Sequence, residues 1–168
     1  MPQFSIDERG VEGIPLKLII VMVILAITIP ATLKGLEIYD RSQTENNLRS
    51  EIEFLSTHIK QIYLNGISNA QDVEVDFKDG MMTKIEWIKL GDSIEGIWSS
   101  IRYKLNHKSD DLFLIKNPNI PVGNVSQGEI GPLKLGAGRQ TIHLECKEGF
   151  DFDEDGTEDM YVEVSKVV

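Results

Sequence analysis

A long, uninterrupted run of apolar residues near the N-terminus is the strongest feature of the hydrophobic pattern. Residues 18–33 read LIIVMVILAITIPATL, sixteen positions without a charge. Extended to residues 14–36, the run contains only two charged residues, Lys17 and Lys34. The long side chain of a lysine can extend its charged end toward water. A helix of this length, at about 1.5 Å per residue, matches a hydrocarbon layer of about 30 Å. The run predicts a helix that lies in a membrane or in an equally apolar protein environment.

The next segment changes from an apolar run to a one-sided pattern. Apolar residues recur at steps of four and three, which is typical of a helix that buries one face, at Leu48, Ile52, Leu55, Ile59 and Ile62. Gly66 is a suitable stop, so one helix is expected over residues 14–65, with this second half packed on the rest of its own chain. Pro30 and Gly35 interrupt the apolar half, and we expect a kink or a melted turn there.

Beyond Gly66 the period becomes two, which predicts strands. Residues 73–77 and 82–90 flank a Lys-Asp-Gly turn and are expected to form a hairpin. Further alternating segments bring the number of short strands to about seven: 97–105, 112–115, 133–135, 141–146 and 160–164. Because no helical pattern intervenes, the class expected is α+β, a long N-terminal helix followed by a mostly antiparallel β head domain.

Residues 117–131 are rich in proline and glycine and are expected to form a long loop. Within it, Asn124 begins an Asn-Val-Ser sequon, and glycan acceptors lie in surface loops. Asn124 is therefore a glycosylation candidate, with an unmodified turn as the alternative.

The net negative charge of the chain argues against one class of function, nucleic-acid binding. The chain has 168 residues with 27 acidic and 17 basic side chains, a net charge of −10. Non-specific nucleic-acid binding needs a basic surface, so no nucleic-acid partner is expected. A single cysteine, Cys146, excludes an intramolecular disulfide.

The residues before the apolar run form a short polar leader, DERGVEG at positions 7–13. A leader that ends in Arg-Gly directly before a hydrophobic helix resembles the class III signal of type IV pilin-like proteins, in particular their archaeal branch. That resemblance implies cleavage after Arg9 and Gly10 by a prepilin-type peptidase, so that the mature chain begins at Val11. Bacterial members carry a glutamate at the fifth mature position, where this chain has Pro15; the archaeal branch does not depend on it.

The resemblance implies a division into a leader peptide (1–10), a membrane-spanning or filament-core helix with an amphipathic stalk (11–66) and a β-rich head domain (67–168). It further implies a membrane-inserted precursor that polymerises with copies of itself into a cell-surface filament, with the pilus assembly machinery as partner. Adhesion, motility and a minor-pilin role remain open. The alternative is a single-pass anchored extracellular module for binding or bracing that is neither processed nor polymerised.

The C-terminal segment concentrates negative charge. Residues 148–168 carry eight acids and one lysine, and carboxylates at alternate positions followed by a glycine suit a hard divalent cation. An EF-hand loop would have a glutamate where Val162 stands. The segment instead resembles the Asp-x-Asp-x-Asp-Gly-x-x-Asp calcium loops that join two strands in integrin-type repeats. That resemblance implies a structural Ca²⁺ held by Asp151, Asp153, Asp155 and Asp159, with the carbonyl of Thr157; a solvated acidic turn is the alternative.

Catalytic patterns are scarce, and a non-enzyme is expected. The sequence has no glycine-rich phosphate loop, HExxH, GxSxG or paired CxxC. His143 and Cys146 share a predicted strand but fall on opposite faces, so they cannot act together. His58 is expected to be a surface or docking residue of the helix, and His107 lies in a polar turn. An anchored hydrolase is the remaining, weaker alternative.

Overall fold

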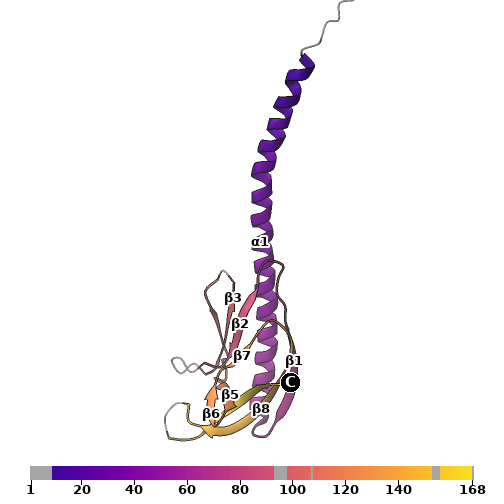
Figure 1. Cartoon of the computed structure of the whole chain (residues 1–168). Coiled ribbons are helices and arrows are strands. Elements are labelled where there is room, and N and C mark those ends of the chain that lie inside the picture. Colours follow the sequence, from indigo (N-terminus) through magenta and orange to yellow (C-terminus); the bar gives the residue numbers. More distant parts are fainter. Residues whose placement is uncertain (1–8, 93–97, 107, 153–155, 168) are drawn as a thin grey trace, which may run out of the picture. The chain divides into compact units, whose positions relative to one another are not determined.

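A computed structural model describes residues 9–92, 98–106, 108–152 and 156–167. One helix, α1 (Arg9–Asn65), precedes nine strands in this described part (Figure 1). The strands are β1 (Ala70–Phe77), β2 (Ile85–Leu90), β3 (Ser100–Leu105), β4 (Asp111–Leu114), β5 (Val122–Ser126), β6 (Glu129–Gly131), β7 (Leu133–Leu135), β8 (Gly138–Phe150) and β9 (Asp159–Lys166). The predicted α+β class, a long helix followed by a β-rich region, is confirmed.

A kink or a melted turn was expected near Pro30 and Gly35. Helix α1 is unbroken from Arg9 to Asn65, so the melted turn is wrong. Proline lacks a backbone N–H, so Pro30 itself donates no hydrogen bond within the helix. Two threonine hydroxyls add bonds in the same region. Thr28 donates to the carbonyl of Ile24 at 2.7 Å, and Thr32 donates to that of Thr28 at 2.9 Å. The helix thus passes the proline without losing its helical backbone.

The chain divides into two compact units, one that ends at Tyr39 and one that extends from Asp40 to Val168. The first contains the apolar part of α1. The second contains the amphipathic part of α1 and all the strands, and Figure 1 shows that part of the helix alongside them.

Two sheets make up the β region. Their strand orders are β1-β8-β9-β5-β6 and β4-β3-β2-β7. Among the described strands only β5 and β9 pair in parallel, and the other pairs are antiparallel as predicted. The predicted hairpin of β1 and β2 is wrong, because β1 pairs with β8 in one sheet and β2 lies in the other. The intervening segment is a crossover between the sheets rather than a tight turn.

The long loop expected over residues 117–131 is also wrong in its second half. Strands β5 and β6 form an antiparallel hairpin there, with Ser126 paired to Glu129. Its two turn residues, Gln127 and Gly128, have φ values of 56° and 84°, and positive φ at both positions suits the right-handed twist of a hairpin. Glutamine is an unusual residue at such a position, which is why the turn was not predicted.

One hydrophobic core joins the helix to both sheets. The five predicted stripe residues of α1, from Leu48 to Ile62, are all at most 3% exposed. They belong to one cluster with buried side chains from both sheets, including Val73, Val75 and Phe77 of β1, Ile88 and Leu90 of β2, Ile101 of β3, and Val162 and Val164 of β9. The predicted docking of the amphipathic half of α1 on its own β region is confirmed.

Candidate functional site

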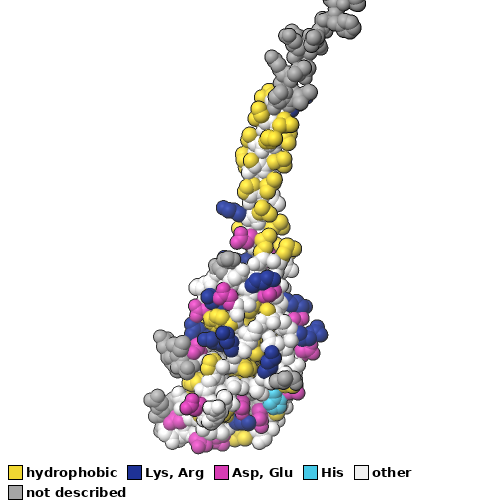
Figure 2. All heavy atoms as spheres, viewed as in Figure 1, with side chains coloured by type: hydrophobic (Ala, Val, Ile, Leu, Met, Phe, Trp, Pro, Cys, Tyr) yellow, Lys and Arg dark blue, Asp and Glu magenta, His cyan; other side chains and the backbone are white. Residues whose placement is uncertain are grey.

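The apolar part of α1 exposes its side chains on every face. Its large hydrophobic residues from Leu16 to Leu36 are between 48% and 69% exposed. Figure 2 shows hydrophobic side chains covering this part of the helix, whereas charged side chains gather over the β region. An 18-residue window of α1 has a mean hydropathy of 2.5, and none of that window is buried. The helix is long and apolar enough to cross a membrane, which suits a membrane anchor or a signal segment.

The predicted cleavage junction lies where α1 begins. The backbone of Arg9, Gly10 and Val11 forms the first turn of the helix, five residues earlier than the start predicted from the hydrophobic pattern. Residues 1–8, the remainder of the predicted leader, lie outside the described residues. The junction and the apolar segment therefore belong to one continuous helix.

The acidic C-terminal segment connects β8 to β9, as predicted. Two of its carboxylates accept hydrogen bonds from backbone N–H groups inside the same turn. The N–H of Gly156 donates to Oδ2 of Asp151 at 2.9 Å, and that of Phe152 donates to Oδ2 of Asp159 at 2.9 Å. These bonds close the turn from its two ends.

An aromatic cluster under this turn was not predicted. The ring of Phe152 lies 5.5 Å from that of Trp98 and 5.7 Å from that of Tyr161, and Phe150 lies 5.3 Å from Tyr161. Two of these three pairs, Trp98 with Phe152 and Phe150 with Tyr161, are edge-to-face, the arrangement that the ring quadrupoles favour. The only sequence signal was the alternation of Phe150 and Phe152 among acids. The cluster fixes the start of the acidic turn on the sheet.

The predicted calcium ligands lie in and around this turn. Asp151 and Asp159 lie at its two ends, and each accepts a backbone N–H within the turn. The other two predicted carboxylate ligands, Asp153 and Asp155, lie outside the described residues. Within the described part of the chain, no group of three or more His, Cys, Asp or Glu side chains is placed to hold a metal. Calcium binding through Asp151, Asp153, Asp155 and Asp159, with the carbonyl of Thr157, therefore remains a prediction.

An acidic residue of the helix, Asp40, binds the backbone of the segment that crosses from β1 to β2. The carboxylate of Asp40, on α1, accepts the backbone N–H groups of Met81 at 2.7 Å, Met82 at 3.0 Å and Thr83 at 2.9 Å. These bonds lower the pKa of Asp40 from 3.8 to about 2, because they favour the charged carboxylate. Asp40 thus holds the crossover on the helix.

The same crossover needs a glycine where it meets α1. A Cβ atom on Gly80 would lie 2.2 Å from Oγ1 of Thr44 and 2.7 Å from a carboxylate oxygen of Asp40. Thr44 is 3% exposed and donates its own hydroxyl to the carbonyl of Asp40. The backbone can therefore approach the helix closely only at a residue without a side chain.

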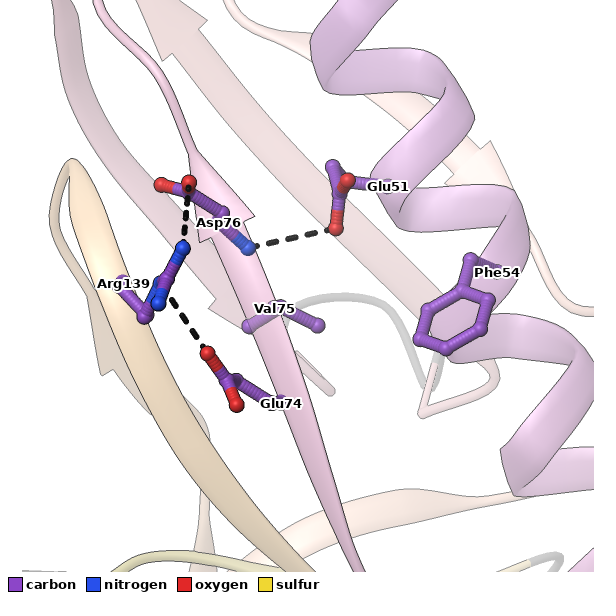
Figure 3. A pocket seen from close by; sticks show the side chains of 6 residues that line it. All are labelled: Glu51, Phe54, Glu74, Val75, Asp76 and Arg139. Atoms are coloured by element: carbon purple, nitrogen blue, oxygen red, sulfur yellow. Dashed lines mark hydrogen bonds and ion pairs between the residues drawn. The ribbon is translucent and has the colours of Figure 1, made fainter.

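A groove lies between α1 and the edge strand β1 (Figure 3). It is lined by Glu51 and Phe54 of the helix, by Glu74, Val75 and Asp76 of β1, and by Arg139 of β8. Its carboxylates already have partners: Glu51 accepts the N–H of Asp76 at 3.3 Å, and Glu74 lies 3.0 Å from Nε of Arg139. Phe54 is 47% exposed at the margin of the groove. One hydrogen bond, from Asp76 to Glu51, joins β1 to the helix in this groove, and the ion pair of Glu74 with Arg139 joins β1 to β8.

Asn124 lies on strand β5 instead of in a loop. Its Nδ2, the atom that would carry a glycan, donates to the carbonyl of Val164 on the neighbouring strand β9 at 2.8 Å. This bond gives Asn124 a role in the sheet. Glycosylation at Asn124 remains a prediction.

His143 and Cys146 lie on one strand, β8, as the alternating pattern predicted. Cys146 is buried, while His143 is partly exposed, with its Nδ1 2.6 Å from Oδ1 of Asp72. The two residues therefore lie on opposite faces of β8, as expected. His58 lies partly exposed on α1, 4.5 Å from the ring of Phe54 between centroids, and His107 lies outside the described residues.

The candidate functional features of the described residues are thus an exposed apolar helix that begins at Arg9 and Gly10, and an acidic turn between β8 and β9. Comparison with protein-family models, with curated proteins and with solved structures found no match. The functional proposal therefore rests on the sequence and geometry of this chain.

Proposed function

We propose that this protein is a structural, non-catalytic subunit of a surface filament of the archaeal type IV pilin-like kind. The precursor enters the membrane through the apolar part of α1. A prepilin-type peptidase removes residues 1–10, and the assembly machinery then transfers the helix from lipid to a bundle of helices from other copies. The β region is displayed outside the cell.

One observation carries the proposal: a long helix whose first half is exposed and apolar and whose second half is buried on its own β region. The side chains from Leu16 to Leu36 are about half exposed, whereas Ile52, Leu55 and Ile59 are fully buried. Exposed apolar surface of this extent needs lipid or protein around it. A helix built in this way can exchange a lipid environment for contact with other copies, while its own β region stays folded.

The acidic turn has a structural role in this proposal. A Ca²⁺ ion held by Asp151, Asp159 and the intervening residues would offset the repulsion among the acids between β8 and β9. Extracellular modules use such sites to fix turns at millimolar calcium. The ion would rigidify the exposed end of the subunit and take no part in a reaction.

Processing of the N-terminus tests the proposal. The full chain is expressed together with a prepilin-type peptidase of the archaeal kind, and its intact mass is measured in the membrane fraction. Gly10→Val places a branched side chain at the junction and is expected to abolish cleavage. Gly13→Val makes the same change three residues further along the same helix and serves as the matched control. The proposal predicts a start at Val11 for the parent chain and for Gly13→Val only.

An intact N-terminus in the parent chain would contradict the filament proposal. Retention of residues 1–10, with the protein found only in membranes, would favour the single-pass anchored module. Cleavage at the same rate in Gly10→Val would show that Gly10 does not define the junction.

A further inference from the structure

The crossover between β1 and β2 exposes two adjacent methionines. Met81 is 85% exposed, more than any other large hydrophobic residue that the structure describes, and Met82 is 42% exposed. The next residue, Thr83, is buried. Single apolar side chains on a protein surface are ordinary, but two together on one turn form a small apolar projection.

The backbone of this projection makes its hydrogen bonds inside the protein. The N–H groups of residues 81–83 donate to the carboxylate of Asp40. The N–H groups on either side also have protein acceptors: the carbonyl of Thr83 for Gly80 at 2.8 Å, Oδ1 of Asn106 for Lys84 at 2.6 Å, and Oδ1 of Asp79 for Ile85 at 2.9 Å. Every N–H group from residue 80 to residue 85 is therefore satisfied without water.

A turn with these two properties can enter a partly apolar environment at low cost. Moving an unpaired backbone N–H out of water is expensive, which is why irregular backbone rarely faces lipid. Pairing within the protein removes that cost here. Methionine is unbranched and flexible, so its side chain adapts to surroundings that have no fixed shape. Both properties favour contact with lipid.

The crossover is attached to α1 directly after the apolar segment. Asp40, which holds it, comes four residues after Leu36 and directly after Tyr39. Four residues of helix rise about 6 Å, and four residues in any conformation span at most about 14 Å. The headgroup layer on each side of a bilayer is about 5–8 Å thick. A bilayer that takes up residues 16–36 therefore has its headgroup layer near Asp40.

Local charge also suits a lipid surface. The chain as a whole carries −10, but residues 34–41 and 76–84 together contain four basic and four acidic side chains and no net charge. Lys78 lies 3.3 Å from Asp76, and Lys84 lies 3.5 Å from Asp79. Anionic headgroups attract basic residues and repel acidic ones. They would repel the chain as a whole, but not this region.

We infer that the crossover, through Met81 and Met82, is a contact site for the headgroup layer of a lipid bilayer. The inference rests on one step of the proposed function, the entry of the apolar part of α1 into the membrane. It gives the β region a shallow lipid contact of its own, in addition to the segment that crosses the bilayer. A protein partner is the alternative occupant that the experiment distinguishes.

Quenching of a fluorescent label by lipids tests the inference on the full chain. Met81→Cys is labelled with the polarity-sensitive dye NBD, and the protein is incorporated into phospholipid vesicles at a low ratio of protein to lipid. The natural Cys146 is 0% exposed, so the folded parent chain should take up little label. Leu64→Cys is the matched control, because Leu64 is an apolar residue, 71% exposed, in the last turn of α1.

Lipids that carry a spin label near the headgroup should quench the dye at Met81→Cys several-fold more than at Leu64→Cys. Equal quenching at the two positions would overturn the inference. Emission typical of an apolar environment at Met81→Cys, without quenching by the spin-labelled lipids, would assign the crossover to a protein partner and would also overturn it.

The apolar character of Met81 is tested separately, with the dye on Met82→Cys. Met81→Leu keeps an apolar side chain, whereas Met81→Gln has nearly the same length and is polar. Quenching by lipid should persist in Met81→Leu and fall several-fold in Met81→Gln. The same quenching in both variants would contradict the role of the methionines.

The outcomes separate this inference from the proposed function. Sheared filaments of chains that start at Val11, without lipid quenching at Met81→Cys in vesicles, would overturn the lipid contact and leave the filament proposal intact. Quenching at Met81→Cys in a chain that the peptidase does not cleave would support the lipid contact and contradict the filament proposal. Leu25→Cys, within the apolar segment, should be quenched by lipids labelled on their acyl chains, and its failure would overturn both.

Discussion

At the scale of single residues, Asp40 and Gly80 determine how the crossover from β1 to β2 lies on the helix. Three successive N–H groups, from Met81 to Thr83, point at one carboxylate, and the backbone beside them can approach only because Gly80 lacks a side chain. The sequence did not indicate this arrangement. Hydrophobic spacing identifies a buried face, but it does not tell which exposed acid will meet a turn some forty residues away.

Asp40→Asn is expected to lower the stability of the chain at neutral pH, because a neutral amide accepts the three N–H groups more weakly than a carboxylate does. The pKa of Asp40 in the fold is about 2, below its ordinary 3.8. Its stabilising effect is therefore present above the ordinary value and is lost as the pH falls from 3.8 toward 2. Thermal melts of the full chain in detergent should show a smaller loss over that interval for Asp40→Asn.

Glu53→Gln, an exposed acid on the same helix, is the control for Asp40→Asn. It should follow the pH dependence of the parent chain. A melt of Asp40→Asn with the full acid dependence of the parent would show that Asp40 is not the titrating group.

Gly80→Ala should destabilise the fold, because its Cβ would lie 2.2 Å from Oγ1 of the buried Thr44. Overpacking of this kind costs about 1–3 kcal/mol in the free energy of unfolding. At Gly136 an added Cβ meets nothing within 4 Å. Gly136→Ala should therefore change stability by less than about 1 kcal/mol. Equal melting temperatures for the two variants would contradict the close approach.

At the scale of elements, predictions succeeded where one face of a segment is buried. The stripe from Leu48 to Ile62 is a run of five positions at helical spacing, and all five are buried. Strands β8 and β9 alternate over many residues and pair as expected. Strands β5 and β6 were missed because they are short and contain Gly123 and Gly131. Strands β1 and β2 were wrongly paired because adjacency in sequence does not determine which sheet a strand joins.

Truncation of the buried stripe measures how strongly α1 is held on the β region. Ile59 is 0% exposed and Leu64 is 71% exposed on the same helix. Ile59→Ala should cost about 2–5 kcal/mol in the free energy of unfolding, through lost burial and the cavity that remains. Leu64→Ala should change it by at most about 0.5 kcal/mol. Thermal unfolding followed by circular dichroism would measure both, and a small effect at Ile59 would contradict the packing of the helix on the sheets.

The turn between β8 and β9 is expected to bind Ca²⁺ and to be stabilised by it. Ca²⁺ should raise the melting temperature with half-saturation at about 10⁻⁴–10⁻³ M, the range of extracellular modules. Asp159→Asn keeps an acceptor for the N–H of Phe152 but removes a charge, and should abolish this rise. Glu129→Gln, an exposed acid on β6, should retain it. Identical melts in a calcium chelator and at about 10 mM Ca²⁺ would contradict the calcium site.

At the scale of the whole molecule, the chain separates two kinds of surface. Exposed apolar side chains lie along α1 before Tyr39, and the residues from Asp40 onward form a unit with its own hydrophobic core. The hydrophobic pattern predicted this separation, because residues 18–33 are apolar all round the helix whereas the stripe from Leu48 to Ile62 occupies one face. It did not predict that the helix would remain unbroken through Pro30.

The N-terminal residue of the native protein tests the central claim most directly. Filaments sheared from the surface of cells and the membranes left behind are analysed separately by mass spectrometry of the intact chain. The filament proposal predicts a chain that starts at Val11 in the sheared material. Chains that retain residues 1–10 and occur only in the membrane fraction would contradict it.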